Sequence, residues 1–363
     1  MPKNKNTTPS KVYFKPIDSY KKTSEINNAA KNLLELIQKE EHILDFSKQI
    51  PIKVHFGEED CDTFIEPKNF EGIINYLKKE SKAKNTPSNP NIFYTETNVL
   101  YKGKRTTRES HTTLAKEHGF TNLPIIIADG EMGENYVEVD ISEIKPKHFK
   151  KCKIGKVIVD SPQLILIAHF KGHMMAGFGG ALKQLAMGCG ARGGKLAMHS
   201  NSKPILNPVA CKKCFTCSKN CPADACIIDT LVPHIDYNKC IGCAKCIAVC
   251  PYNAMKINWV STLPGKFVEK IAEYAYAAQK NKKVVYINFA LNITKECDCM
   301  DKKQKPIYKD IGVLASTDPV ALDKACFDLL QKAEKKKPFG GDHIFDYTQE
   351  ISFGNTQYEL VIL

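Results

Sequence analysis

The chain has 363 residues, of which 43% are hydrophobic and 25% are charged, which is an ordinary balance for a globular protein with a large core. No apolar run approaches the roughly 18 to 20 residues that cross a bilayer. The first residues also lack the hydrophobic stretch of a signal peptide. We therefore expect a cytoplasmic protein without a membrane span.

The formal net charge of +12 raises the question of a nucleic-acid partner. The lysines are scattered, however, and the only notable run is the "KKK" at residues 335–337. No helix–turn–helix or zinc-finger spacing is present. The scattered lysines and the missing motifs therefore argue against a nucleic-acid partner. The positive charge agrees with attraction to an acidic redox partner or an anionic cofactor.

Along the chain, short apolar strands alternate with helices. The first 20 residues are polar, and we predict an extended segment there, followed by an amphipathic helix over residues 24–46. Further strands are predicted at 52–56, 92–95, 124–128, 136–140, 156–160, 163–170, 284–293 and 311–315, and further helices at 68–80, 105–118, 178–187, 265–281 and 318–333. This order predicts a layered α/β fold with a largely parallel sheet and helices on both faces.

A cysteine-rich segment interrupts this alternation. Nine of the fifteen cysteines lie between Cys211 and Cys250, in two runs with the spacing C-x₂-C-x₂-C-x₃-C-P. The first run, "CKKCFTCSKNCP", begins at Cys211, and the second, "CIGCAKCIAVCP", begins at Cys240. In a reducing compartment, clustered thiols more often bind metal than form disulfides. A zinc site needs only four cysteines and does not account for both proline-terminated runs, so the spacing favours two [4Fe–4S] clusters.

In such paired runs, three cysteines bind one cluster and the fourth binds the other. The predicted ligands are Cys211, Cys214, Cys217 and Cys250 for one cluster, and Cys240, Cys243, Cys246 and Cys221 for the second. The segment resembles the bacterial two-cluster ferredoxin, which implies a pseudo-symmetric α+β module that carries electrons one at a time. Phe215, where such motifs often have glycine, and the extra thiol of Cys226 depart from the pattern without removing a ligand.

These observations predict a small α+β ferredoxin-like domain inserted in a larger α/β domain. The predicted parts are an N-terminal extension with one helix (1–50), the first part of the α/β domain (51–203), the inserted domain (204–258) and the second part of the α/β domain (259–363).

Four stretches outside the cysteine runs point to a family. They are "TETNVLYKGKRTTRESH" (95–111), "AHFKGHMMAGFGGALKQLAMGCGARGGKLAMHS" (168–200), "INFALNITKECDC" (287–299) and "DIGVLASTDPVALDKA" (310–325). Together they resemble the domain-of-unknown-function family numbered 362, in its branch with an embedded two-cluster ferredoxin. The resemblance covers residues 52–330 and implies an iron–sulfur oxidoreductase of the kind found in anaerobic metabolism.

Within "HFKGHMMAGFGGALKQL", a buried strand leads through a glycine-rich turn into a helix. Such a unit directs backbone N–H groups and the positive end of a helix dipole at one spot, which favours an anion. Lys171 and His173 are the candidate catalytic residues on this turn, and Gly177, Gly179 and Gly180 the candidate cofactor-binding ones. The alternative is that these glycines only allow close packing of helix and strand.

Other polar residues follow predicted strands and should meet this spot if the strands are parallel. They are Thr97, Tyr101, Arg105, Asn292 and Asp318, although each alone could also be a helix cap or turn former. We rank His169 and His173 above His55, His111 and His199 as functional histidines. Cys297 and Cys299 form a C-x-C pair that could bind metal but has no further ligand nearby in the sequence.

Two functions remain open. In the first, the clusters pass single electrons to or from an anionic cofactor or substrate, such as a flavin or deazaflavin, in the α/β domain. In the second, the chain is a non-enzymatic electron relay whose large domain docks a redox partner protein. A ferredoxin or another redox protein is the expected partner in either case, and the sequence does not indicate the oligomeric state.

Overall fold

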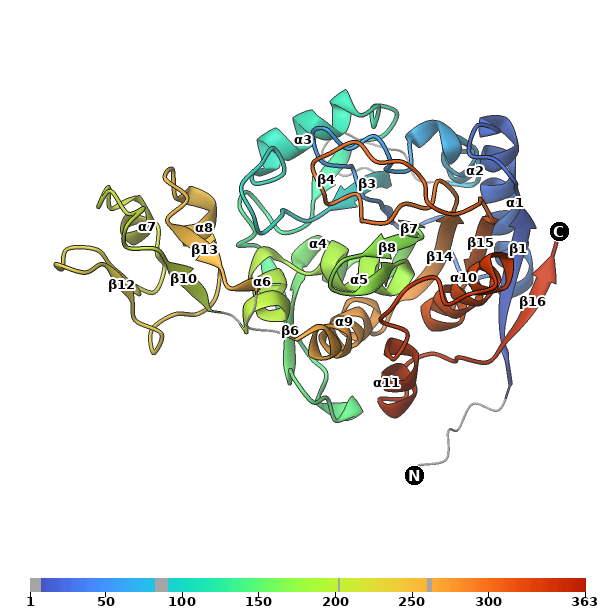
Figure 1. The fold of residues 1–363 in the computed structure, drawn as a ribbon. Coiled ribbons are helices and arrows are strands. Elements are labelled where there is room, and N and C mark those ends of the chain that lie inside the picture. Colours follow the sequence, from blue (N-terminus) through green and yellow to red (C-terminus); the bar gives the residue numbers. More distant parts are fainter. Residues whose placement is uncertain (1–7, 82–90, 202, 260–262) are drawn as a thin grey trace.

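The computed structural model describes residues 8–81, 91–201, 203–259 and 263–363 (Figure 1). Within these ranges, eight strands form one central sheet. In spatial order they are β16 (Tyr358–Ile362), β1 (Ser10–Pro16), β15 (Gly312–Ser316), β14 (Lys283–Ala290), β7 (Gln163–His169), β2 (Ile50–Lys53), β3 (Ile92–Glu96) and β4 (Ile125–Ile127). Only β15 runs against its neighbours. The predicted layered, largely parallel α/β fold is confirmed.

Helices cover both faces of this sheet (Figure 1). One face carries α1 (Thr23–Glu41), α2 (Glu71–Glu80) and α3 (Arg108–Glu117), and the other carries α5 (Ala181–Cys189), α9 (Pro264–Gln279), α10 (Pro319–Glu334) and α11 (Ile344–Glu350). Along β7, Leu164 and Leu166 enter one hydrophobic core, whereas Ile165 and Ile167 enter the other. Since both faces are buried, the central strands are apolar throughout and polar groups collect at their ends.

The N-terminal segment belongs to the α/β body. The strand β1 lies between β15 and β16, and Tyr13 and Val12 are fully buried. Because β1 pairs with strands near the other end of the chain, no local pattern shows that the polar extended segment is an inner strand. The strand β1 and the helix α1 are therefore part of the α/β body.

Two predicted strands differ from expectation. Residues "KVIVD" form a short helix, α4 (Lys156–Asp160), in place of a strand. Its β-branched residues favour a strand, but β7 begins only three residues later, which leaves room only for a turn. The predicted strand at 136–140 is present as β5 (Tyr136–Asp140), yet it pairs with β6 (Lys151–Gly155) in a separate hairpin.

The glycine-rich turn after β7 is also a hairpin. It consists of β8 (Lys171–His173) and β9 (Gly177–Gly179), so α5 begins three residues later than the predicted helix. Gly177 has φ 80°, and an added Cβ would lie 1.9 Å from the backbone oxygen of Gly340. The hairpin therefore requires glycine at this position because the backbone of another loop contacts it.

The cysteine-rich segment follows α6 (Arg192–Ser200) and lies to one side of the sheet (Figure 1). Its elements are β10 (Pro204–Leu206), α7 (Thr216–Lys219), β11 (Cys226–Ile227), β12 (His234–Ile235), α8 (Lys245–Val249) and β13 (Met255–Ile257). The first strand pairs with the last, β10 with β13, so the chain enters and leaves this segment at one place. That geometry agrees with the proposed insertion.

Two short 3₁₀ helices, η1 (Pro67–Asn69) and η2 (Ser142–Ile144), complete the described elements. None of the helices in the described ranges combines the length and the apolar character that a membrane crossing demands.

We predict that Asp318→Ala lowers the free energy of unfolding by about 1–2 kcal/mol. The Asp318 carboxylate caps α10 by accepting from the N–H groups of Val320 (2.9 Å) and Ala321 (3.2 Å), and it also accepts from the Ser10 hydroxyl (2.9 Å). Chemical denaturation measures the effect. The control Asp18→Ala should change stability by less than about 0.5 kcal/mol, since the side chain of Asp18 is 79% exposed. Equal effects would contradict the capping role.

Candidate functional site

The nine cysteines of the cysteine-rich segment, the eight predicted ligands and Cys226, line two separate cavities. The first is lined by Cys211, Cys214, Cys217 and Cys250, and the second by Cys221, Cys240, Cys243 and Cys246 together with Cys226. This is the grouping that the interleaved spacing predicts, with the last cysteine of each run placed in the other cavity. All eight thiols are free of disulfides. Four thiols around a compact space are the donor set of a [4Fe–4S] cluster, so the residues fit that group.

The backbone around the two cavities repeats itself. Positive φ angles occur at Lys213, Phe215 and Asp224, and they recur at the equivalent positions of the second run, Gly242, Ala244 and Asn253. Phe215, with φ 60°, thus occupies a conformation that favours glycine. The N–H groups of Ala225 and Ala254 each donate to a cysteine sulfur at 3.2 Å, to Cys221 and Cys250 respectively. Such donors to ligand sulfurs tune the reduction potential of a cluster.

The second cavity faces the α/β body. Its Cys240–Cys243 turn packs against the start of α6, where a Cβ added to Gly193 would lie 2.9 Å from the Gly242 oxygen. The Lys153 Nζ donates to the Ile241 oxygen of the same turn at 2.7 Å. We call this second cavity the inner cysteine site.

The first cavity, which we call the outer cysteine site, faces away from the body. Cys214 is exposed, and the lining residues Phe215 and Tyr252 are 40% and 49% exposed. A partner molecule can therefore approach the outer cysteine site directly.

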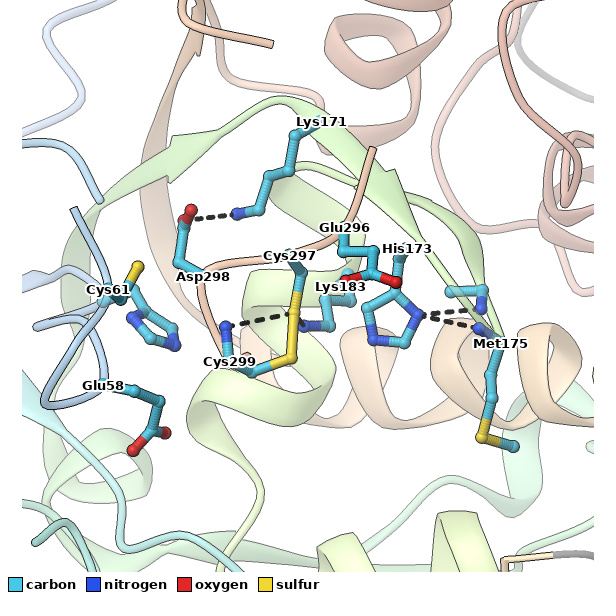
Figure 2. The surroundings of a disulfide bond; sticks show 12 residues. Glu58, Cys61, Lys171, His173, Met175, Lys183, Glu296, Cys297, Asp298 and Cys299 are labelled. Carbon is cyan, nitrogen blue, oxygen red and sulfur yellow. Dashed lines mark hydrogen bonds and ion pairs between the residues drawn. A yellow bond between two sulfur atoms is a disulfide. The ribbon is translucent and has the colours of Figure 1, made fainter. Parts of the chain in front are cut away.

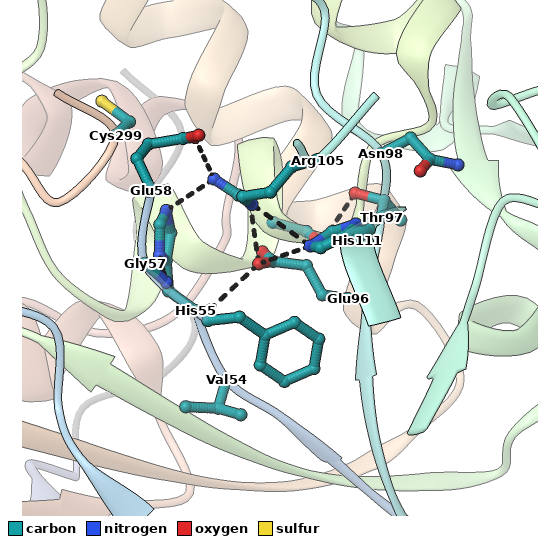
Figure 3. Close-up of polar contacts among 12 residues, drawn as sticks. Val54, His55, Gly57, Glu58, Glu96, Thr97, Asn98, Arg105, His111 and Cys299 are labelled. Atoms are coloured by element: carbon teal, nitrogen blue, oxygen red, sulfur yellow. Dashed lines mark hydrogen bonds and ion pairs between the residues drawn. The ribbon is translucent and has the colours of Figure 1, made fainter. Parts of the chain in front are cut away.

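At the carboxyl ends of β2 and β3, buried charges form a network around Glu96 (Figure 3). The Glu96 carboxylate pairs with Lys53 Nζ at 2.9 Å and with Arg105 at 2.7 Å, and Arg105 also pairs with Glu58. Burial alone would raise the pKa of Glu96, but the neighbouring Arg105 and Lys53 hold this pKa well below its ordinary value. The guanidinium of Arg105, a predicted cofactor ligand, also donates to His111 and is thus already occupied within the protein.

Thr97 and Tyr101, two further predicted cofactor ligands, also bond within the protein. The Thr97 hydroxyl donates to the Gly188 oxygen at 3.0 Å and accepts from Lys195 Nζ. The Tyr101 hydroxyl donates to Glu58 and lies 3.2 Å from the Cys299 oxygen. The side chains of both residues therefore form hydrogen bonds within the protein that hold neighbouring segments in place.

A second charged group lies beyond the end of β7. The Asp298 carboxylate contacts Lys171 Nζ at 2.9 Å and His169 Nδ1 at 3.0 Å, and His169 Nε2 lies 3.0 Å from the Leu291 oxygen. Burial alone would raise the pKa of Asp298, but His169 and Lys171 hold it well below its ordinary value. A cavity of about 20 Å³ adjoins this group, with room for a water molecule and not for a flavin.

The C-x-C pair lies beside the same cavity, joined as a disulfide between Cys297 and Cys299 (Figure 2). Lys183 Nζ lies 3.4 Å from Cys297 Sγ. Burial and the neighbouring Lys171 lower the pKa of Lys183 to about 7. His173 also lies within 4.8 Å of the two sulfurs. No further polar partner lies near this pair in the sequence, but the fold places Lys183 and His173 beside it.

The predicted anion site at the start of α5 is already occupied by the chain itself. The Asp323 carboxylate accepts from the N–H groups of Ala181 (2.7 Å) and Leu182 (2.9 Å). Burial raises the pKa of Asp323 to about 6. A Cβ added to Gly180 would lie 2.3 Å from the same carboxylate, whereas one added to Gly179 would meet only Lys183 and Lys171 side chains at ordinary distance. Gly180 thus serves close packing, as in the alternative interpretation.

The side chains of two predicted site residues, Asp318 and Asn292, do not line the cavity. Asp318 lies at the opposite edge of the sheet, because β15 is antiparallel and its carboxyl end points away from those of β7 and β14. Asn292 follows β14 with φ 52° and presents its backbone, whose oxygen lies 3.2 Å from His169 Nε2. The assumption that all strand ends meet was wrong for β15.

The residues that sequence reasoning missed are four buried charges, Lys53, Glu58, Glu96 and Asp298, and the partly buried Lys183. A signal existed for Glu96, which sits in the apolar strand "IFYTE", and for Asp298, which lies between the two cysteines of "CDC". A charge within a buried strand is costly unless it is paired, so it indicates a partner elsewhere.

Comparison with known proteins now identifies the family. Residues 50–328 match the family described as "Domain of unknown function (DUF362)". The chain belongs to this family. The predicted resemblance is thereby confirmed.

Curated relatives match over shorter spans. The chain is 42% identical over 73 residues to the iron–sulfur subunit of a putative dimethyl sulfoxide reductase from Halobacterium salinarum, which is 19% of this chain and 26% of that protein. It is 34% identical over 55 residues to the electron transport protein HydN of Escherichia coli, 15% of this chain and 31% of that protein. The chain thus spans less than a third of these relatives. Their iron–sulfur and electron-transfer character supports a ferredoxin-type [4Fe–4S] module here.

Among solved structures, the lactate racemase apoprotein from Thermoanaerobacterium thermosaccharolyticum is 14% identical with a TM-score of 0.38, over 88% of this chain and 56% of that chain. A likeness of this size carries no argument about function.

We predict that Glu96→Gln destabilises the protein by about 3–5 kcal/mol, because it leaves the buried Lys53 and Arg105 with too little negative charge. Chemical denaturation measures the effect. The matched control is Glu59→Gln, which removes an exposed ion pair with Lys104 (2.9 Å). Its free energy of unfolding should change by less than about 1 kcal/mol. Similar losses for both variants would show that the Glu96 network does not support the fold.

Proposed function

We propose that this protein is an iron–sulfur oxidoreductase that passes single electrons through two [4Fe–4S] clusters to or from a site in the α/β body. The observation that carries this proposal is the presence of two cavities, each lined by the four cysteines that the spacing predicts as ligands, of which the inner one packs against α6. A bound cluster supplies one-electron chemistry, and the chain supplies its ligands, its N–H donors and its contact with the body.

Electrons would enter at the outer cysteine site. It is the exposed one, and residues 204–258 carry six lysines against three acidic residues. A positive surface attracts an acidic ferredoxin or a similar redox protein and makes its binding sensitive to salt. The inner cysteine site would then deliver electrons to the body.

Within the body, the site beyond β7 would receive them. Lys171 and Lys183 place positive charge beside this small cavity, which suits the anionic group of a cofactor or substrate whose remainder lies outside the cavity. The Nδ1 atom of His173 accepts from the N–H groups of Met175 (3.2 Å) and Ala176 (3.0 Å), so Nε2 carries the proton. Burial and the nearby Lys183 hold the pKa of His173 well below its ordinary value, so the neutral ring is arranged to donate a hydrogen bond from Nε2, and Lys171 to attract the anion.

We predict that anaerobically reconstituted protein binds about eight iron ions, and that Cys214→Ser or Cys243→Ser each removes about half of them. Iron analysis and electron paramagnetic resonance of the reduced protein measure this. Cys152→Ser is the control, because Cys152 is buried in the main core and should leave the iron content unchanged. About one zinc ion per four cysteines, with no iron signal, would contradict the proposal.

An electron relay is the second candidate, supported by relatives that are described as an iron–sulfur subunit of an enzyme and an electron transport protein. Mass spectrometry of small molecules released from anaerobically purified protein separates the two. We expect an anionic redox cofactor such as a flavin or deazaflavin, or turnover when one is added to protein with reduced clusters. If neither is found, and clusters exchange electrons only with a partner protein, the relay replaces the enzyme.

A further inference from the structure

The Cys297–Cys299 disulfide is the only cross-link in a chain whose other thirteen cysteines are free, all fifteen lying in the described ranges. A lone disulfide among many free thiols is more often catalytic or redox-sensing than structural. Only one residue separates its two cysteines, so the bond constrains the unfolded chain very little. Its position therefore calls for a chemical explanation.

The surroundings suit reduction of the disulfide. Lys183 Nζ lies 3.4 Å from Cys297 Sγ, and the backbone N–H of Cys299 donates to the same sulfur at 3.3 Å. Figure 2 shows Lys183 and His173 on the same side of the disulfide. A nearby cation and N–H donors stabilise a thiolate, so they favour the state in which the S–S bond is open. With its pKa near 7, Lys183 can also give up a proton at neutral pH.

A metal site made of the same residues fits less well. The sulfurs and His173 are close enough for a shared ion. However, Nδ1 of His173 faces two backbone N–H donors and must present a lone pair to them, which leaves the proton on Nε2. A neutral imidazole in this state has no lone pair on Nε2 to offer a metal, whereas it can donate a hydrogen bond to sulfur.

A short stretch of chain connects the disulfide to the cysteine sites. Leu100 packs in the same hydrophobic cluster as Cys217, Cys246 and Cys250, and Tyr101 packs against that cluster. The hydroxyl of Tyr101 then lies 3.2 Å from the backbone oxygen of Cys299. The side chain of Tyr101 thus packs against the hydrophobic cluster that includes three predicted cluster ligands, and its hydroxyl contacts the backbone of Cys299.

We propose that the Cys297–Cys299 disulfide is the two-electron acceptor of the clusters, reached past Tyr101. This inference rests on the proposed function, and it names the first acceptor in the α/β body. In the step, each of two reduced clusters gives one electron, the S–S bond breaks, and two protons are taken up, one of them from Lys183 and one from solvent. The products are two oxidised clusters, the dithiol and a neutral Lys183, which regains its proton from solvent. The dithiol can then reduce a substrate by two electrons.

Reductive titration of the anaerobic protein with reduced methyl viologen tests the proposal. Wild type should take up about four electrons, one for each cluster and two for the disulfide, whereas Cys297→Ser/Cys299→Ser should take up about two. Cys61→Ser is the matched control, because Cys61 is a buried free cysteine near the same site, and it should still take up about four. Uptake of only two electrons by wild type would overturn the proposal.

A rapid-mixing experiment tests the route. With two electron equivalents, cluster absorbance in wild type should bleach and then recover as the electrons move to the disulfide, and alkylation followed by mass spectrometry should find both thiols. In the double serine variant the bleaching should persist. A persistent bleach in wild type, or two thiols already present in the oxidised protein, would refute the inference while leaving the proposed function intact. Protein that binds no iron would instead remove the proposed function itself.

Lys183→Met examines the positioning role of Lys183. The variant should keep its iron and its four-electron capacity, but the disulfide should be reduced at a more negative potential and its recovery phase should slow several-fold. Lys303→Met, which changes an exposed lysine on the same loop as the disulfide, should leave both unchanged. An unaltered potential in Lys183→Met would contradict the assigned role.

Discussion

The pairing of Glu96 with Lys53 and Arg105 is the interaction on which the polar site depends. All three charged side chains are buried, and buried charges are stable only when each one is paired with an opposite charge at short distance. The network therefore fixes β2 against β3 and holds the segment that follows Glu96. That segment includes Leu100 and Tyr101, which contact the cysteine-rich segment. The buried ion pairs of Glu96 thus lie at the start of the segment that reaches the hydrophobic cluster of the cysteine sites.

Sequence reasoning succeeded where the rule is local. The spacing of each cysteine run sets a turn that collects three thiols, and the return of the same spacing from Cys240 onward identifies the partner run. Apolar strands and helical periodicity likewise predicted most elements and the α/β class. Sequence reasoning failed where a residue far along the chain decides whether a group is free or paired. The N–H groups at the start of α5 look free in sequence, but Asp323, far along the chain from Ala181, occupies them.

Strand direction is the clearest limit of the local view. The polar residues after β3, β7 and β14 do meet, since those strands are parallel. Asp318 follows β15, which is as apolar as the parallel strands. However, β15 runs antiparallel to both of its neighbours, β14 and β1. Nothing within "GVLAS" encodes its direction, because the pairing with β1 is made to residues near the other end of the chain. Similarly, Lys183 becomes a partner of Cys297 only after the hairpin β8–β9 and the loop after β14 have closed on each other.

The place of the cysteine-rich segment in the chain has a consequence for electron transfer. The segment leaves the body directly after α6, the helix that packs on the inner cysteine site, and its ends are joined by the pairing of β10 with β13. A separate ferredoxin would have to dock for each electron, at a rate limited by its concentration. A tethered module has a high effective concentration at its own body, so contact at the inner site is permanent. In the proposed function, only the outer site then needs to meet a partner, and single electrons that arrive there one after another would accumulate until a two-electron step is possible.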